Sequence, residues 1–387
     1  MTTKKKRKAK SDELAARRVP ALVSYLHPFR LVEVEGAKPW KLTIENVNKA
    51  DWDYVALHEV VGGLDVGLTS PYHLVVARDG ALALPPIPQL RQDQTAVEFF
   101  NKCLAALLLG GVYCEAITVD NLEFGSLIDW KYLRVSSNAA GASNRFHYLI
   151  RMQAAAPIEA IALMRPRTVA FSKLQEAIRT GFDVLSAIPE MSGEFLLKGV
   201  TATARRDWGS ALANHWIVVE QITAHLWRRY VLNTAASGPA IEGRREQLED
   251  SRTWTTSTRQ ELLFQKSILD ANTLRTLSRA RKARNALVHR GAHPTEEAAF
   301  ACYDAVLSLM KIVLAGAAIP LATLRLRDHT LSDPFRPPVP RRIDPQYWHP
   351  IPKLPGEEEL EKMEAQIVAR SPRKAAKGSA RGPKRPK

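Results

Sequence analysis

Two side chains that can act on a phosphodiester lie close together in residues 281–291. Arg284 is followed directly by Asn285, and His289 comes five positions after the arginine. An arginine guanidinium is a permanently charged planar fork that fits a phosphate group, and histidine exchanges protons near neutral pH. Because RNA carries its own nucleophile, the 2′-hydroxyl, the pair predicts RNA cleavage in which Arg284 stabilises charge on the phosphate and His289 transfers protons.

The spacing between the arginine and the histidine has little weight without its context. The chain holds 34 arginines and 10 histidines, so roughly two or three such matches are expected by chance. A second match, Arg342 with His349, lies among five prolines between positions 337 and 350. No regular helix forms in such a segment, whereas Arg284 and His289 lie within a series of helical patterns.

Four amphipathic helical patterns surround the motif. Apolar residues recur at three- and four-residue steps, which is typical of a helix with one buried face. The four patterns cover 206–232, 258–269, 272–289 and the stretch from Pro294 to about 314. Gly291 is expected to end the third helix, and the short connections favour an antiparallel four-helix bundle.

On a helix, Asn285 and His289 share one face, so that Asn285 is a candidate to orient the imidazole. Arg284 and His289 are five residues apart, which places them about 140° apart around the helix axis. The two side chains therefore cannot act from one face of one helix. A homodimer in which two copies of the motif meet across a twofold axis is expected to supply a complete site.

Residues 284–291 have the sequence Arg-Asn-Ala-Leu-Val-His-Arg-Gly and lie near the end of the third of four helices. This motif resembles that of the HEPN superfamily. The motif is most similar to those of the Apea-like and related defence-associated branches, and the resemblance covers about residues 200–318. It implies a helical bundle and a metal-independent endoribonuclease whose composite site forms across a dimer. It also implies a toxin-like role in phage defence or in a stress response, with RNA as the partner. Many members of the superfamily have lost catalysis and serve as binding modules.

Five further residues are candidates to support the site. Glu220 lies beside the apolar stripe of the first helix, where it either pairs with Arg284 or Arg281 or faces solvent. The basic residues Arg281, Lys282 and Arg290 flank the motif and either hold an RNA backbone or form a solvated surface. His293 extends the site or is an ordinary loop residue.

The charge of the chain is concentrated at its two ends. The net charge is +15, but six basic residues lie in 4–10 and eight in 370–387, and neither segment holds an acid. The part between them is nearly neutral. Both ends are low-complexity segments that are expected to be disordered and either to bind RNA or to act as solubilising arms.

Other classes of protein find little support in the composition. Three scattered cysteines give neither a disulfide framework nor a zinc site. No carboxylate cluster and no His/Cys grouping has metal-ligand spacing, and no cofactor motif is present, so no cofactor is expected. No apolar stretch approaches ~20 residues, and no secretory leader follows the basic start. We therefore expect no membrane association and a cytoplasmic location.

We expect the N-terminal half to be an α+β domain that senses or binds something and holds the bundle in place. Strands are predicted over 53–61, 72–77, 81–84 and 112–119, with a hairpin turn at Asp79-Gly80. Helices are predicted over 94–109 and about 170–187. The resulting organisation is a basic arm (1–18), an α+β domain (19–192), a helical bundle (193–318), a proline-rich segment (319–355), a short helix (356–369) and a basic tail (370–387).

Two functional hypotheses follow from these observations. The first is a metal-independent endoribonuclease controlled by the N-terminal domain. The second is a catalytically silent module that uses the bundle to dimerise and the basic tails to bind nucleic acid. The presence of Arg284, Asn285 and His289 together favours the first.

Overall fold

The chain combines an N-terminal α+β region with an all-helical C-terminal region, as the sequence predicts. The computed structural model describes residues 18–69, 72–136, 142–236, 241–324, 326 and 356–370. The residues up to Pro338 form one compact unit, and helix α16 (Glu357–Arg370) belongs to a second one. The predicted basic arm, apart from Arg18, and the basic tail, apart from Arg370, lie outside the described residues. So does most of the proline-rich segment.

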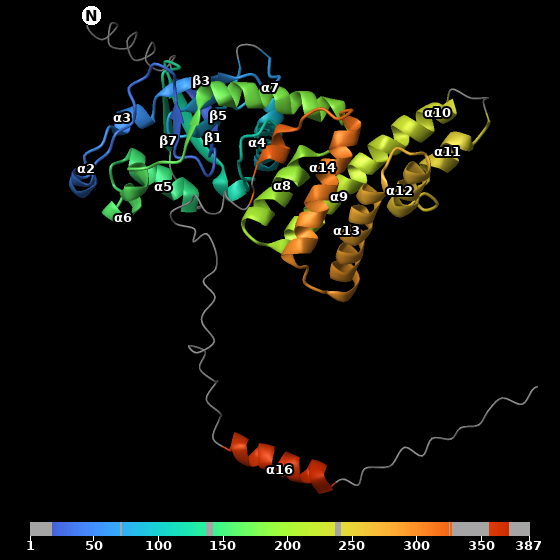
Figure 1. The fold of residues 1–387 in the computed structure, drawn as a ribbon. Coiled ribbons are helices and arrows are strands. Elements are labelled where there is room, and N and C mark those ends of the chain that lie inside the picture. Colours follow the sequence, from blue (N-terminus) through green and yellow to red (C-terminus); the bar gives the residue numbers. More distant parts are fainter. Residues whose placement is uncertain are drawn as a thin grey trace, which may run out of the picture. The chain divides into compact units, whose positions relative to one another are not determined.

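An antiparallel half-barrel sheet organises the α+β region (Figure 1). Its strands, in spatial order, are β3 (Val60–Leu64), β4 (Leu74–Ala77), β5 (Ala81–Leu84), β1 (Arg18–Tyr25), β6 (Glu123–Ile128) and β7 (Tyr132–Ser136). A backbone bridge between Glu59 and Tyr132 joins the two edges of the sheet. The predicted turn at Asp79-Gly80 connects β4 to β5, and Gly80 has φ +85°, which glycine adopts at little cost. Separately, β2 (Leu31–Glu33) pairs in parallel with β8 (Thr168–Ala170).

Helices cover one face of this sheet and join it to the bundle. Helix α4 (Asp93–Leu109) packs against α7 (Phe171–Ala187) and against α8 (Gly193–Ala204). The approach of α4 to α7 is close because glycine replaces a side chain at the contact. A Cβ atom on Gly181 would lie 1.8 Å from the carbonyl oxygen of Ala106.

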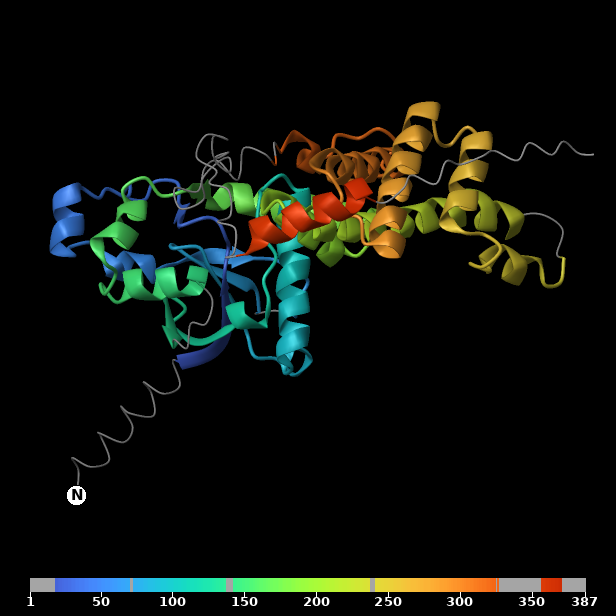
Figure 2. The same cartoon turned by 90° about the horizontal axis from the view of Figure 1, so that it is seen from below.

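The helical region is a bundle in which α8 packs on α9 (Trp208–Trp227) and α9 packs on α14 (Glu296–Val313). Helix α13 (Ala271–Arg290) lies along α14, and the shorter α12 (Thr256–Gln265) contacts both α9 and α13. Figures 1 and 2 show this arrangement from two directions. The apolar core continues without interruption from the sheet through α4 into the bundle.

Shorter elements complete the described chain. They are α2 (Ile44–Lys49), α3 (Tyr54–Leu57), α5 (Ala142–Arg151), α6 (Pro157–Ala160), α10 (Asn233–Ala236), α11 (Arg244–Glu249) and a π-helical turn at Arg228–Leu232 that continues α9. Four 3-10 turns lie at Pro88–Leu90, Val119–Asn121, Ile161–Leu163 and Pro320–Thr323. Within the described residues, no helix is long and apolar enough to cross a lipid bilayer.

Two predicted strands differ from the structure. Only Val60 and Val61 of the stretch 53–61 lie in a strand, β3, and the stretch 112–119 contains none. The stretch 53–61 begins with helix α3, because the side chain of Asp53 caps it by accepting a hydrogen bond from the amide of Ala56 at 3.1 Å. The stretch 112–119 forms no strand, although it is apolar and largely buried. Part of its backbone bonds to side chains instead: the side-chain amide of Asn101 bonds to the backbone N–H and C=O of Ile117, and the hydroxyl of Thr201 accepts from the amide of Ala116.

The four predicted bundle helices are present as α9, α12, α13 and α14. The bundle also contains α8, a helix that was not predicted from the sequence. Because α8 is buried over most of its length and carries small residues, it lacks the polar face that marks a surface helix. Strands β1, β6 and β7 were likewise not predicted.

Candidate active site on helix α13

Helix α13 holds the Arg-Asn-x-x-x-His motif and has well-defined ends. Asp270 caps its start by accepting a hydrogen bond from the amide of Thr273 at 2.7 Å. Gly291 ends it with φ +63°, and the amide of Gly291 bonds to the carbonyl of Leu287 at 3.0 Å. The predicted glycine stop is therefore confirmed, and the motif occupies the last two turns of the helix.

All the charged side chains of α13 are basic. One apolar face, with Leu277 and Ala280, is buried in the bundle. The rest of the helix carries six basic side chains and no acidic one: Arg275, Arg279, Arg281, Lys282, Arg284 and Arg290. Among the ion pairs of the described chain, none includes a residue of this helix. Uncompensated positive charge in this arrangement attracts a polyanion.

The structure brings two of the three motif residues into contact. Arg284 is half-buried, and its Nη1 donates to Oδ1 of Asn285 at 3.4 Å. Asn285 thus contacts the arginine, and it has no hydrogen bond with His289, which is exposed. Since 271–290 is a continuous helix, Arg284 and His289 project about 140° apart. One copy of α13 therefore directs the guanidinium and the imidazole to different sides.

The supporting residues are only partly near the motif. Lys282 and Arg290 are exposed beside it, and His293 is exposed in the loop that follows. Arg281 is half-buried and lines a pocket between α13 and α12.

Glu220 does not pair with the motif. Its Oε1 accepts a hydrogen bond from Nε1 of Trp216 at 2.8 Å, one turn earlier on α9. Within the described chain it forms no ion pair with Arg281 or Arg284. We therefore leave Glu220 out of the proposed site, since its carboxylate is engaged by the indole.

A buried ionic cluster in the α+β region was not predicted from the sequence. Nε and Nη2 of Arg151 donate to the two carboxylate oxygens of Asp79 at 2.7 and 2.6 Å. Burial raises the pKa of Asp79, but the charge and hydrogen bonds of Arg151 outweigh burial and hold that pKa well below its usual range. His147 also contacts Asp79 and stacks on Tyr25, and burial lowers the pKa of its imidazole to about 4. Because these groups are enclosed, they fix α5 against the sheet.

A second histidine–carboxylate pair lies at the end of α9. Nδ1 of His225 is 2.5 Å from Oε2 of Glu190, and Arg228 donates to the other carboxylate oxygen. His225 belongs to α9, Arg228 to the π-helical turn that continues it, and Glu190 to the loop before α8. No local signal in the sequence joins them, because they are 35 or more residues apart. Their mutual contacts connect that loop to the bundle.

Comparison of the chain with family models, with curated proteins and with solved structures gave no match.

Proposed function

We propose that this protein is a metal-independent endoribonuclease of the HEPN type, with a toxin-like role in phage defence or in a stress response. The observation that carries the proposal is the placement of the motif. Arg284 and His289 lie at the accessible end of a helix that presents only positive charge, within a helical bundle. The resemblance of residues 284–291 to HEPN ribonucleases supports the same function.

In the proposed reaction, the 2′-hydroxyl of the RNA attacks the adjacent phosphorus. His289 removes or supplies a proton at the attacking or leaving oxygen. Arg284 donates two hydrogen bonds to the phosphate oxygens as negative charge gathers on them. Asn285, through its contact with the guanidinium, holds Arg284 in position. The phosphate ends as a 2′,3′-cyclic diester, and the leaving strand carries a 5′-hydroxyl.

The divergence of the two side chains supports a homodimer as the active form. Arg284 of one protomer and His289 of the other would face a common cleft around a twofold axis. Arg281, Lys282 and Arg290 would then hold the RNA backbone on either side of this cleft. The α+β region would control access or respond to a ligand.

The alternative is a silent HEPN-like module that dimerises and binds nucleic acid without cutting it. The contact of Asn285 with Arg284, rather than with His289, is the observation that favours this alternative. An imidazole without an orienting partner is less well positioned for proton transfer.

Substitutions in the motif separate the two functions. His289→Ala should lower the cleavage rate by about 10²–10⁴-fold, and Arg284→Ala by about 10²–10³-fold. Arg284→Lys should be nearly as damaging as Arg284→Ala, because an ammonium keeps the charge but loses the planar fork. The exposed Arg179 of α7 provides a matched control, and Arg179→Ala should cleave at the wild-type rate. RNA that is bound but not cut by the wild-type protein would establish the silent module instead.

A further inference from the structure

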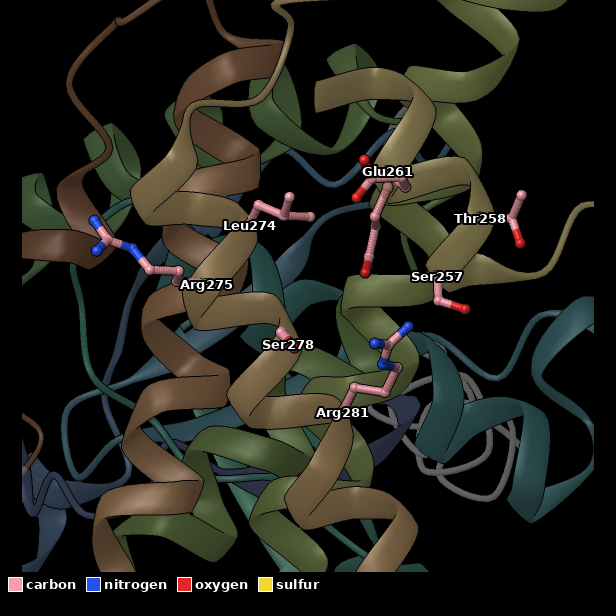
Figure 3. Close-up of a pocket in the computed structure, with 8 residues that line it drawn as sticks. Ser257, Thr258, Glu261, Leu274, Arg275, Ser278 and Arg281 are labelled. Atoms are coloured by element: carbon pink, nitrogen blue, oxygen red, sulfur yellow. The ribbon is translucent and has the colours of Figure 1, made fainter. Parts of the chain in front are cut away.

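A pocket of about 540 Å³ opens between α12 and α13. Polar side chains from the two helices line it, together with one leucine: Ser257, Thr258, Gln260 and Glu261 from α12, and Leu274, Arg275, Ser278 and Arg281 from α13. Figure 3 shows Arg281 reaching from α13 toward Ser257 of α12. We call this cavity the α12–α13 pocket.

The lining combines a cation, an anion and hydroxyl groups within one cavity. Arg281 has no hydrogen bond or ion pair among the described residues, so its five N–H donors are available. Glu261 accepts one hydrogen bond, from the side chain of Gln265 at 3.1 Å, which leaves its second oxygen available. The hydroxyls of Ser257 and Ser278 donate or accept, and Leu274 supplies an apolar surface. This set matches a ligand with an anionic group, a flat apolar body and N–H donors.

The floor of the pocket is held in place. Gln260 is buried, and its Nε2 donates to Oγ1 of Thr223 on α9 at 3.3 Å. Thr255 caps α12 by accepting from the amide of Thr258 at 3.3 Å. The cavity is therefore bounded by a helix with a fixed start, rather than by a loop.

The pocket lies next to the candidate active site. Arg281 precedes Arg284 by three residues on the same helix, which is about 4.5 Å along the axis. A ligand held by Arg281 is therefore adjacent to whatever Arg284 binds. If Arg284 binds the scissile phosphate, the neighbouring nucleotide of the same strand reaches the pocket.

We propose that the α12–α13 pocket binds a single ribonucleotide of the RNA strand, adjacent to the phosphate that Arg284 contacts; this rests on the proposed ribonuclease function. Arg281 holds a phosphate of that nucleotide through two N–H groups. Glu261 accepts from N–H groups on the edge of the base, which is how proteins recognise unstacked bases in single-stranded RNA. The pocket thereby gives the enzyme a preference for the base beside the cleavage point.

Binding of mononucleotides tests this proposal without any cleavage step. The four ribonucleoside 3′-monophosphates are titrated into the full-length protein by isothermal calorimetry. At least one should bind with a Kd of about 1 mM or tighter, and Arg281→Ala should weaken it at least ten-fold, about 1.4 kcal/mol. Ser278→Phe, which fills the cavity and keeps Arg281, should also abolish binding. Arg279→Ala removes an exposed arginine of the same helix that does not line the pocket, and it should change Kd less than two-fold.

The base preference tests the part assigned to Glu261. Glu261→Gln should reduce the difference in affinity among the four nucleotides, because the amide presents a donor where the carboxylate only accepts. Absence of binding by all four nucleotides, equal losses for Arg281→Ala and Arg279→Ala, or an unchanged base preference in Glu261→Gln would each overturn the proposal. Since the probes contain no scissile bond, a pocket that binds nucleotides in a protein that cuts no RNA would refute the ribonuclease alone.

Discussion

Acid should destabilise the helical bundle through His215, and the structure sets the size of the effect. His215 lies on α9 with no exposed surface, and its Nε2 contacts Oγ1 of Thr203 at 3.2 Å. The hydroxyl of Thr203 donates to the carbonyl of Gly199, so it accepts from the imidazole. The other ring nitrogen, Nδ1, has no hydrogen-bond partner among the described residues. Protonation of Nδ1 would place an unpaired charge inside the bundle.

Burial lowers the pKa of His215 from 6.5 to about 3 in the folded chain. The unfolded chain therefore binds more protons than the folded chain between these two values. The stabilisation is complete above pH 6.5 and is lost as the pH falls toward 3. From pH 7 to pH 5 the free energy of unfolding should fall by about 2 kcal/mol on account of His215. His147, with a pKa of about 4, should contribute a similar loss.

The measurement is urea unfolding at pH 7 and pH 5 for the wild-type protein, His215→Gln and the exposed control His73→Gln. The free energy lost between the two pH values should be about 2 kcal/mol smaller for His215→Gln than for the wild type. His73→Gln should follow the wild type. An identical pH dependence for His215→Gln and the wild type would show that the reasoning from burial is wrong.

Three further predictions concern the buried contacts of the fold and the assembly of the protein. Asp79→Asn leaves the buried charge of Arg151 without a counter-charge, and urea unfolding should show a loss of about 3–5 kcal/mol; a stability equal to wild type would contradict the buried pair. Gly181→Ala drives a methyl group into the carbonyl of Ala106, so thermal unfolding should reveal a loss at the upper end of about 1–3 kcal/mol. The control Gly209→Ala, whose Cβ meets no atom closer than 3.6 Å, should not be destabilised. Light scattering at micromolar concentration should find a dimer, and a strict monomer with full nuclease activity would exclude the composite site.

The helices were the most predictable part of the fold, since their signals are local. The apolar spacing of 94–109 and the stop signal Gly291 after 272–289 are local features of the sequence, and α4 and α13 form close to the predicted bounds. The segment 112–119 shows the limit of this reasoning. Its composition favours a strand, but the backbone of Ala116 and Ile117 bonds to the side chains of Thr201 and Asn101, which only the tertiary fold brings near.

The same distinction applies to the candidate site. Arg284 and His289 were recognisable because they belong to one short motif on one helix. The contact between Arg151 and Asp79 joins residues 72 positions apart, and Glu261 reaches the α12–α13 pocket only because α12 folds back on α13. No pattern along the chain indicates which acid meets which base.

The products of RNA cleavage test the central claim most directly. A single-stranded RNA is incubated with the wild-type protein in EDTA, beside His289→Ala and beside the same RNA with one 2′-deoxy residue at the mapped cleavage point. We expect a 2′,3′-cyclic phosphate and a 5′-hydroxyl at each cut, no cutting at the 2′-deoxy position, and cutting about 10²–10⁴-fold slower by His289→Ala. Cleavage that requires a divalent cation, or that proceeds at the 2′-deoxy position, would contradict the claim.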